Sequence, residues 1–155
     1  MTEKRYYIAY GSNLNITQMR SRCPSARIIG TGEIPGYRLL FKGSRTGSYL
    51  TIEPCEGASV PVAAWEISKA DERALDRYEG CPTFYYKKEL RLPIKGIRTG
   101  LVRDRNVFVY IMHEERAFGL PTRFYVDVCL EGYRDFGFDR NRLVEAFFVS
   151  KEAMV

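Results

Sequence analysis

The chain has 155 residues, of which 45% are hydrophobic, so it can form one domain with a sizeable core and is not of disordered composition. No apolar run approaches the roughly 20 residues of a membrane helix, and no signal-peptide segment follows the N-terminus, so we expect a cytoplasmic protein without membrane contact. The net charge of +5 comes from 24 basic and 19 acidic residues that are scattered along the chain, which disfavours nucleic-acid binding and is compatible with a small anionic substrate.

The first predicted elements are a strand and a helix joined by a sharp turn. Strand-favouring residues fill 6–10, Gly-Ser-Asn follows at 11–13, and a helical pattern over 15–22 ends at Cys-Pro, 23–24. A turn between a strand and a helix can offer backbone N–H groups to an anion. An ordinary turn after a core strand explains the same pattern, so this segment alone leaves both interpretations open.

Strands dominate the next part of the chain. We expect two pairs of strands, each joined by a turn, over 26–34 and 37–42 with Pro-Gly at 35–36, and over 49–53 and 60–67 with a turn at 54–59. The last of these strands is almost continuously apolar around Trp65, which is typical of a central strand.

The second half holds most of the predicted helices. Ser68 and Asp71 form a capping pattern at the start of a helix, which Gly80 and Pro82 end. The other expected elements are strands over 84–92 and 106–112, a helix over 120–133 and a helix capped by Asp139. Because strands follow one another without regular helical crossovers, we predict an α+β fold: a small, mostly antiparallel bent sheet or β-barrel with flanking helices. No repeat or linker interrupts residues 1–155, which we expect to form a single domain.

The residue types that bind metals are too few and too dispersed for a metal site. The four cysteines, at positions 23, 55, 81 and 129, include no Cys-x-x-Cys pair, and His113 is the only histidine. The sequence His113-Glu114-Glu115 lacks the second histidine of a zinc-binding helix and is expected to form a solvated turn. We therefore expect free thiols, no metal and no cofactor.

Glu79 is the main candidate for a catalytic side chain. It lies in the last turn of the helix that ends at Gly80, where the negative end of the helix dipole disfavours a carboxylate and raises its pKa. Partial burial would raise the pKa further, and a carboxyl that titrates near neutral pH is suited to general-base catalysis. A surface glutamate before a capping glycine would have the same sequence, so this segment alone does not decide between the two roles.

Four motifs occur in a distinctive order: Tyr-Gly-Ser-Asn-Leu at 10–14, Arg-Cys-Pro-Ser-Ala at 22–26, Pro-Gly-Tyr at 35–37 and Asp-x-Tyr-Glu-Gly at 76–80. Together they closely resemble the gamma-glutamylcyclotransferase family in order and spacing. The resemblance covers residues 1–95 and continues more weakly at Pro121-x-x-x-Tyr125, which is similar to the late Pro-and-Tyr substrate motif of the family.

The resemblance implies a small barrel-like fold and an enzyme that cyclises the γ-glutamyl group of a small molecule, releasing 5-oxoproline and a free amine. It also implies that Glu79 is the catalytic glutamate and that Tyr125 helps to close the pocket. The residues expected to bind the substrate, mainly in the turn after the first strand, are Tyr7, Tyr10, Gly11, Ser12, Asn13, Leu14 and Tyr125. The expected partner is a small γ-glutamyl molecule, and a homo-oligomer remains open.

Two other functions also remain open. One is a binding or regulatory module that keeps the fold without the chemistry, although Glu79 and the intact Gly-Ser-Asn turn argue against it. The other is a γ-glutamyl hydrolase or transferase, in which water or another amine takes the acyl group. The amine that is released is not defined, because the loops expected to select it, 43–48 and 99–105, resemble the family only weakly.

The remaining aromatic and basic residues are assigned to structural positions. We interpret the tyrosines at 6, 37, 49, 85 and 86 as core or barrel-wall residues, with one or two at the mouth of the pocket. Arg22, Arg27 and Arg38 are interpreted as surface charge.

Overall fold

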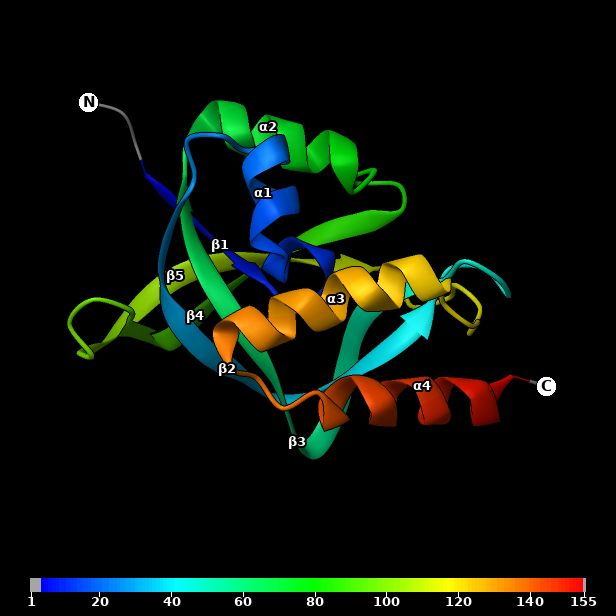
Figure 1. The fold of residues 1–155 in the computed structure, drawn as a ribbon. Helices are drawn as coiled ribbons and strands as arrows, with labels where there is room; N and C mark the ends of the chain where they lie inside the picture. The colour runs from blue at the N-terminus through cyan, green and yellow to red at the C-terminus, as the bar shows by residue number, and fades with distance from the viewer. Residues whose placement is uncertain (1–3, 155) are drawn as a thin grey trace.

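A computed structural model describes residues 4–154 as a closed β-barrel with flanking helices (Figure 1). The strands are β1 (Arg5–Ala9), β2 (Arg27–Lys42), β3 (Tyr49–Ile67), β4 (Tyr85–Gly96) and β5 (Val102–Met112). The helices are the 3-10 helix η1 (Ser12–Leu14) and the α-helices α1 (Ile16–Arg22), α2 (Lys69–Tyr78), α3 (Arg123–Phe136) and α4 (Asn141–Ala153). Around the barrel the strands follow the order β1-β3-β2-β4-β5, and β5 closes on β1.

Antiparallel pairing dominates the barrel, as predicted. The pairs β1–β3, β2–β3, β2–β4 and β4–β5 are antiparallel, whereas β1 and β5 are parallel neighbours through Tyr7 and Phe108. β3 lies between β1 and β2, which confirms the central position expected for 60–67. β4 and β5 extend beyond the predicted 84–92 and 106–112 because they pair as one long hairpin. The architecture confirms the predicted α+β class.

The prediction of strand-ending turns at 35–36 and 54–59 was wrong, because β2 and β3 are each one long strand. The two strands pair with each other along almost their whole length. Gly36, with a φ of 75°, lies at a break in their register, opposite residues 55–58 of β3. The Pro-Gly sequence therefore bends a two-stranded ribbon instead of reversing the chain. Bulges and turns favour the same residues, so the sequence does not separate them.

Local hydrogen bonds set the starts of three helices. The hydroxyl of Ser68 accepts the N–H of Asp71 at 3.1 Å, and the Asp71 carboxylate accepts the N–H of Ser68 at 3.2 Å, which completes the predicted capping box of α2. Thr122 caps α3 by accepting the N–H of Tyr125 at 3.1 Å. The Asp139 carboxylate accepts the N–H of Asn141 at 3.0 Å at the start of α4.

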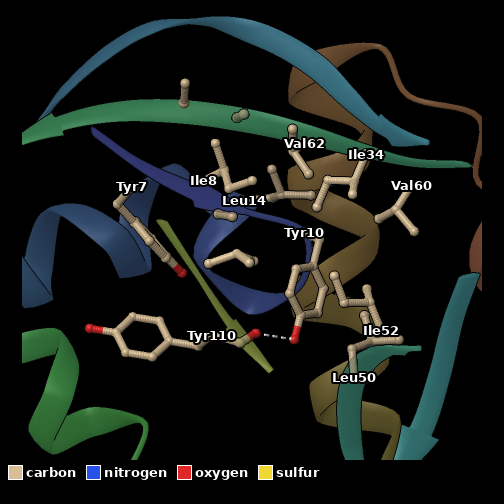
Figure 2. Packing of buried hydrophobic residues seen from close by; sticks show 14 of the residues in the cluster. Tyr7, Ile8, Tyr10, Leu14, Ile34, Leu50, Ile52, Val60, Val62 and Tyr110 are labelled. Atoms are coloured by element: carbon tan, nitrogen blue, oxygen red, sulfur yellow. Dashed lines mark hydrogen bonds between the residues drawn. The ribbon is translucent and has the colours of Figure 1, made fainter. Parts of the chain in front are cut away.

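Buried aliphatic and aromatic side chains fill the barrel and the space between the barrel and the helices, and Figure 2 shows part of this cluster. Within this core the Tyr10 hydroxyl donates to the carbonyl of Tyr110 at 2.7 Å. Leu14 is fully buried against α3, where any side chain at Gly132 would collide with the backbone of Leu14. The core and α3 thus hold the turn after β1 in place. No helix of residues 4–154 is long and apolar enough to span a membrane.

Candidate active site

A cavity of about 330 Å³ opens where the turn after β1 faces the C-terminal end of α2. It is lined by Tyr7, Tyr10, Gly11, Ser12, Asn13, Tyr49, Leu50, Arg77, Tyr78, Glu79, Gly80, Phe84, Tyr85, Tyr110 and Tyr125. Most of these side chains are aromatic, and within the described part of the chain Glu79 is the only acidic residue of the lining. The cavity therefore places one carboxyl group in largely apolar surroundings.

The turn after β1 brings backbone groups to the cavity. The carbonyl of Gly11 accepts the N–H of Leu14 at 3.0 Å, which starts η1. The N–H groups of Ser12 and Asn13 belong to the first turn of η1 and have no acceptor within that helix, so they are suited to bind an anion. A Cβ at Gly11 would lie 3.3 Å from the hydroxyl of Tyr125, so glycine keeps this stretch of backbone open to a ligand.

Glu79 caps the C-terminal end of α2 and faces the turn after β1 across the cavity. Its backbone N–H donates to the carbonyl of Leu75 at 2.8 Å, and the buried Leu75 anchors this end of the helix. Burial raises the pKa of Glu79 from 4.5 to about 7, and the positive charge of Arg22 partly opposes this effect. The carboxyl therefore exchanges its proton near neutral pH.

Aromatic side chains form the mouth of the cavity. The hydroxyl of Tyr125 accepts the N–H of Leu50 at 3.1 Å, which ties α3 to β3. The ring of Tyr49 stands edge-on to Tyr125 at 5.2 Å and to Phe84 at 6.4 Å between ring centroids. Because Tyr49 is 46% exposed, this group borders the opening to solvent.

Arg22 lies beside the cavity and is partly buried, so its interpretation as surface charge was wrong. Its Nη1 donates to the side-chain oxygen of Asn13 at 2.5 Å, and its guanidinium lies 3.7 Å from the centroid of the Tyr78 ring. The amide nitrogen of Asn13 in turn donates to the Tyr7 hydroxyl at 3.0 Å. The side chain folds back from the end of α1 over the turn after β1, which a short sequence motif does not reveal.

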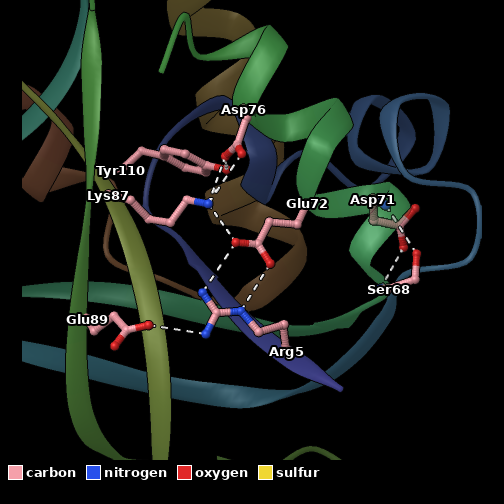
Figure 3. A network of polar contacts seen from close by, with 8 residues as sticks. All are labelled: Arg5, Ser68, Asp71, Glu72, Asp76, Lys87, Glu89 and Tyr110. Carbon is pink, nitrogen blue, oxygen red and sulfur yellow. Dashed lines mark hydrogen bonds and ion pairs between the residues drawn. The ribbon is translucent and has the colours of Figure 1, made fainter. Parts of the chain in front are cut away.

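A network of charged groups holds α2 against the barrel next to the cavity (Figure 3). The Tyr110 hydroxyl donates to the Asp76 carboxylate at 2.5 Å, and Lys87 lies 3.0 Å from Asp76 and 2.5 Å from Glu72. Arg5 of β1 pairs with Glu72 at 3.0 Å. Burial and the bond to Asp76 raise the pKa of Tyr110 far above its ordinary value, so this tyrosine stays protonated. The network connects β1, β4 and β5 to the helix that carries Glu79.

The structure brings most of the predicted site residues together. Those that line the cavity with Glu79 are Tyr7, Tyr10, Gly11, Ser12, Asn13 and Tyr125. Leu14 does not line it, because it is fully buried in the core against α3.

The sequence motifs assign no role to four residues that line the cavity, Leu50, Arg77, Phe84 and Tyr110. Tyr49 and Tyr85, assigned to the barrel wall with one or two such residues at the mouth, both line the cavity. The two-residue alternation of a strand would have placed Tyr110 on one face with Phe108. It would not have indicated which end of that strand borders the site.

Metal-binding residue types do not gather in the described part of the chain. No group of three or more His, Cys, Asp or Glu side chains that could hold a metal ion occurs in residues 4–154. A ring nitrogen of His113 lies 2.7 Å from the carbonyl of Pro82, and Glu114 and Glu115 are exposed, in agreement with the predicted solvated turn.

Comparison with protein-family models gives a match over residues 7–126 to "Gamma-glutamyl cyclotransferase, AIG2-like". The match covers most of the chain and includes the turn after β1, Glu79 and Tyr125. The chain therefore belongs to this family, and it is an enzyme of the gamma-glutamyl cyclotransferase type. A comparison with curated proteins gave no match.

Several solved structures share the fold. One named gamma-glutamyl cyclotransferase has 22% sequence identity and a TM-score of 0.79, over 93% of this chain and 86% of that one. An uncharacterized protein from Homo sapiens has 24% identity with the same coverage and TM-score. A gamma-glutamyl cyclotransferase specific to glutathione, from yeast, has 11% identity and a TM-score of 0.62 over 97% of both chains. At these identities the similarity establishes the fold.

Proposed function

We propose that this enzyme cyclises the γ-glutamyl group of a small γ-glutamyl amine or γ-glutamyl amino acid, with Glu79 as general acid and base. The products are 5-oxoproline and the free amine. The main support for the proposal is the position of Glu79, a partly buried carboxyl with a pKa of about 7, across one cavity from the turn after β1. A carboxyl with this pKa can accept and return a proton at neutral pH.

The proposed reaction needs no nucleophile from the protein. The Glu79 carboxylate takes a proton from the α-ammonium of the substrate, and the α-nitrogen attacks the γ-carbonyl carbon to form a five-membered ring. As the tetrahedral intermediate collapses, Glu79 returns the proton to the leaving nitrogen and the bond between the γ-carbon and that nitrogen breaks. The ring nitrogen loses its second proton to the released amine or to water, which leaves the neutral amide of 5-oxoproline. Holding the glutamyl chain in a folded conformation can correspond to an effective molarity of ~10⁵–10⁸ M.

The turn after β1 would hold the glutamyl part of the substrate. The backbone N–H groups of Gly11, Ser12 and Asn13 are the candidates for binding its α-carboxylate or the developing oxyanion. Two features support this assignment: the absence of a side chain at Gly11 and the position of η1 at the cavity. The released amine would then face the mouth, near Tyr49.

The direct test is release of 5-oxoproline from a panel of γ-glutamyl amines and γ-glutamyl amino acids by the wild type and by Glu79→Gln. We expect release by the wild type alone. Free glutamate in place of 5-oxoproline would show that water takes the acyl group, and the enzyme would then be a γ-glutamyl hydrolase.

We also propose a cytoplasmic location, where the four cysteines, all free thiols in the structure, would stay reduced.

A further inference from the structure

Arg22 makes three contacts that fix its position behind the turn after β1. Its Nη1 donates to the side-chain oxygen of Asn13 at 2.5 Å and its Nη2 to that of Gln18 at 2.6 Å. The guanidinium also packs on the face of Tyr78, 3.7 Å from the ring centroid. Gln18 lies on the same helix, whereas Asn13 and Tyr78 line the cavity, so Arg22 connects α1 to both sides of the site.

The arginine determines which way the Asn13 amide points. A guanidinium has only donors, so the oxygen of Asn13 must face Arg22. Its nitrogen must then face the Tyr7 hydroxyl, which lies 3.0 Å away. Asn13 is 2% exposed, so solvent does not compete for either end of the amide.

This polarity has a consequence for Tyr7. Because its hydroxyl oxygen accepts a hydrogen bond from Asn13, its own hydrogen remains for a different acceptor. Tyr7 lines the same cavity as Glu79, and burial together with the negative charge of Glu79 raises its pKa well above 10. The hydroxyl therefore keeps its hydrogen throughout the working range of pH.

We propose that Arg22 is a positioning residue that, through Asn13, directs the Tyr7 hydroxyl to donate to the reacting carbonyl oxygen of the bound γ-glutamyl group. The carbonyl is the acceptor because the base must lie beside the reacting atoms, and Tyr7 shares the cavity with that base. The identity of this acceptor rests on the proposed function. The donor-to-acceptor direction of the two hydrogen bonds, from Arg22 to Asn13 and from Asn13 to Tyr7, is a property of the free enzyme.

Arg22 also acts on the base by its charge. The side chains that line the cavity around Glu79 include the phenols of Tyr7, Tyr10, Tyr78, Tyr85, Tyr110 and Tyr125, and the exposed Arg77 lies on α2. Burial raises the pKa of Tyr7, Tyr10, Tyr85, Tyr110 and Tyr125, so these phenols are neutral at pH 7, whereas Arg22 lowers the pKa of Glu79 against the effect of burial. Loss of the arginine charge should therefore raise this pKa above its present value of about 7.

The first test compares Arg22→Met with Arg22→Lys. Methionine has no donor, so kcat should fall about ten-fold or more and the acidic limb of the kcat/KM profile should move to higher pH. Lysine keeps a charge and a donor, so it should restore the pH profile and part of kcat. The control is Arg20→Met, which removes an exposed arginine from the same helix and should behave as the wild type. Wild-type kcat and pH profile in Arg22→Met would overturn the proposal.

The second test reverses the direction of the hydrogen bond between Asn13 and Tyr7. Asn13→Asp keeps a partner for Arg22, but a carboxylate is an acceptor and would take the hydrogen of the Tyr7 hydroxyl. We expect this variant to fold normally and to lose as much kcat as Tyr7→Phe, about 10²-fold for an oxyanion donor. In the double variant the two losses should not add. Additive losses would show that the new charge acts independently of Tyr7 and would overturn the proposed polarity.

A measurement on the free enzyme separates this inference from the proposed function. The side-chain amide hydrogens of Asn13, followed by ¹⁵N NMR, should exchange with water slowly in the wild type and in Arg20→Met. They should exchange about ten-fold faster or more in Arg22→Met. Equal exchange rates would overturn the inference whether or not any substrate reacts. Absence of 5-oxoproline release by the wild type would count against the proposed function alone.

Discussion

Replacing Glu79 with glutamine measures the burial of this carboxyl without any substrate. The folded protein raises the pKa of Glu79 from 4.5 to about 7, because burial disfavours the charged form. Between these two pH values the folded state binds a proton that the unfolded state has lost. The free energy of unfolding should therefore fall as the pH rises from 4.5 to 7, and the loss should be complete above pH 7.

The size of the effect follows from the two pKa values. The interval from 4.5 to about 7, at 1.36 kcal/mol for each pH unit, corresponds to about 3 kcal/mol. Glutamine resembles the protonated carboxyl in shape and has no charge. Glu79→Gln should therefore be more stable than the wild type by about 3 kcal/mol at pH 8 and nearly equal to it at pH 4.

Urea unfolding at the two pH values tests this prediction. The control is Glu145→Gln on α4, which removes an exposed carboxylate and should change stability by less than about 0.5 kcal/mol at either pH. A Glu79→Gln variant that is no more stable than the wild type at pH 8, or that differs from it equally at both pH values, would show that the carboxyl is not buried in its charged form.

Three further predictions concern activity. Gly11→Val should raise KM at least about ten-fold, because its side chain would meet Tyr125 and Leu50 at the cavity, and an unchanged KM would contradict the assignment of this backbone to substrate binding. The value of kcat/KM should fall about ten-fold for each pH unit below about 7, as Glu79 becomes protonated, and a flat profile from pH 5.5 to 7 would remove Glu79 as the base. Treatment with EDTA should leave activity unchanged, since the substrate amine and Glu79 supply the nucleophile and the base, and its loss would reveal a required metal.

Local sequence signals predicted the helices well. The capping pattern of Ser68 and Asp71 acts through hydrogen bonds between near neighbours in the sequence, so a short segment is enough to predict it. The bend at Gly36 was mistaken for a turn because its outcome depends on pairing with β3, which lies outside any local window.

Only those residues of the candidate site that lie within the family motifs could be predicted from the sequence. Glu79 and the turn after β1 were found in this way, and the structure places them at one cavity. Tyr110 and Arg22 were missed because each contacts the site through the fold: Tyr110 arrives on the last strand, and Arg22 reaches back from the end of α1. Leu14 lies within a motif but packs into the core, so membership of a motif did not ensure a position in the cavity.

The most direct test of the account is the release of 5-oxoproline from a panel of γ-glutamyl amines and amino acids by the wild type and by Glu79→Gln side by side. We expect 5-oxoproline and an equal amount of free amine from at least one substrate with the wild type, and none above background with a folded Glu79→Gln. Release at a comparable rate by Glu79→Gln would contradict the role of Glu79 as the base.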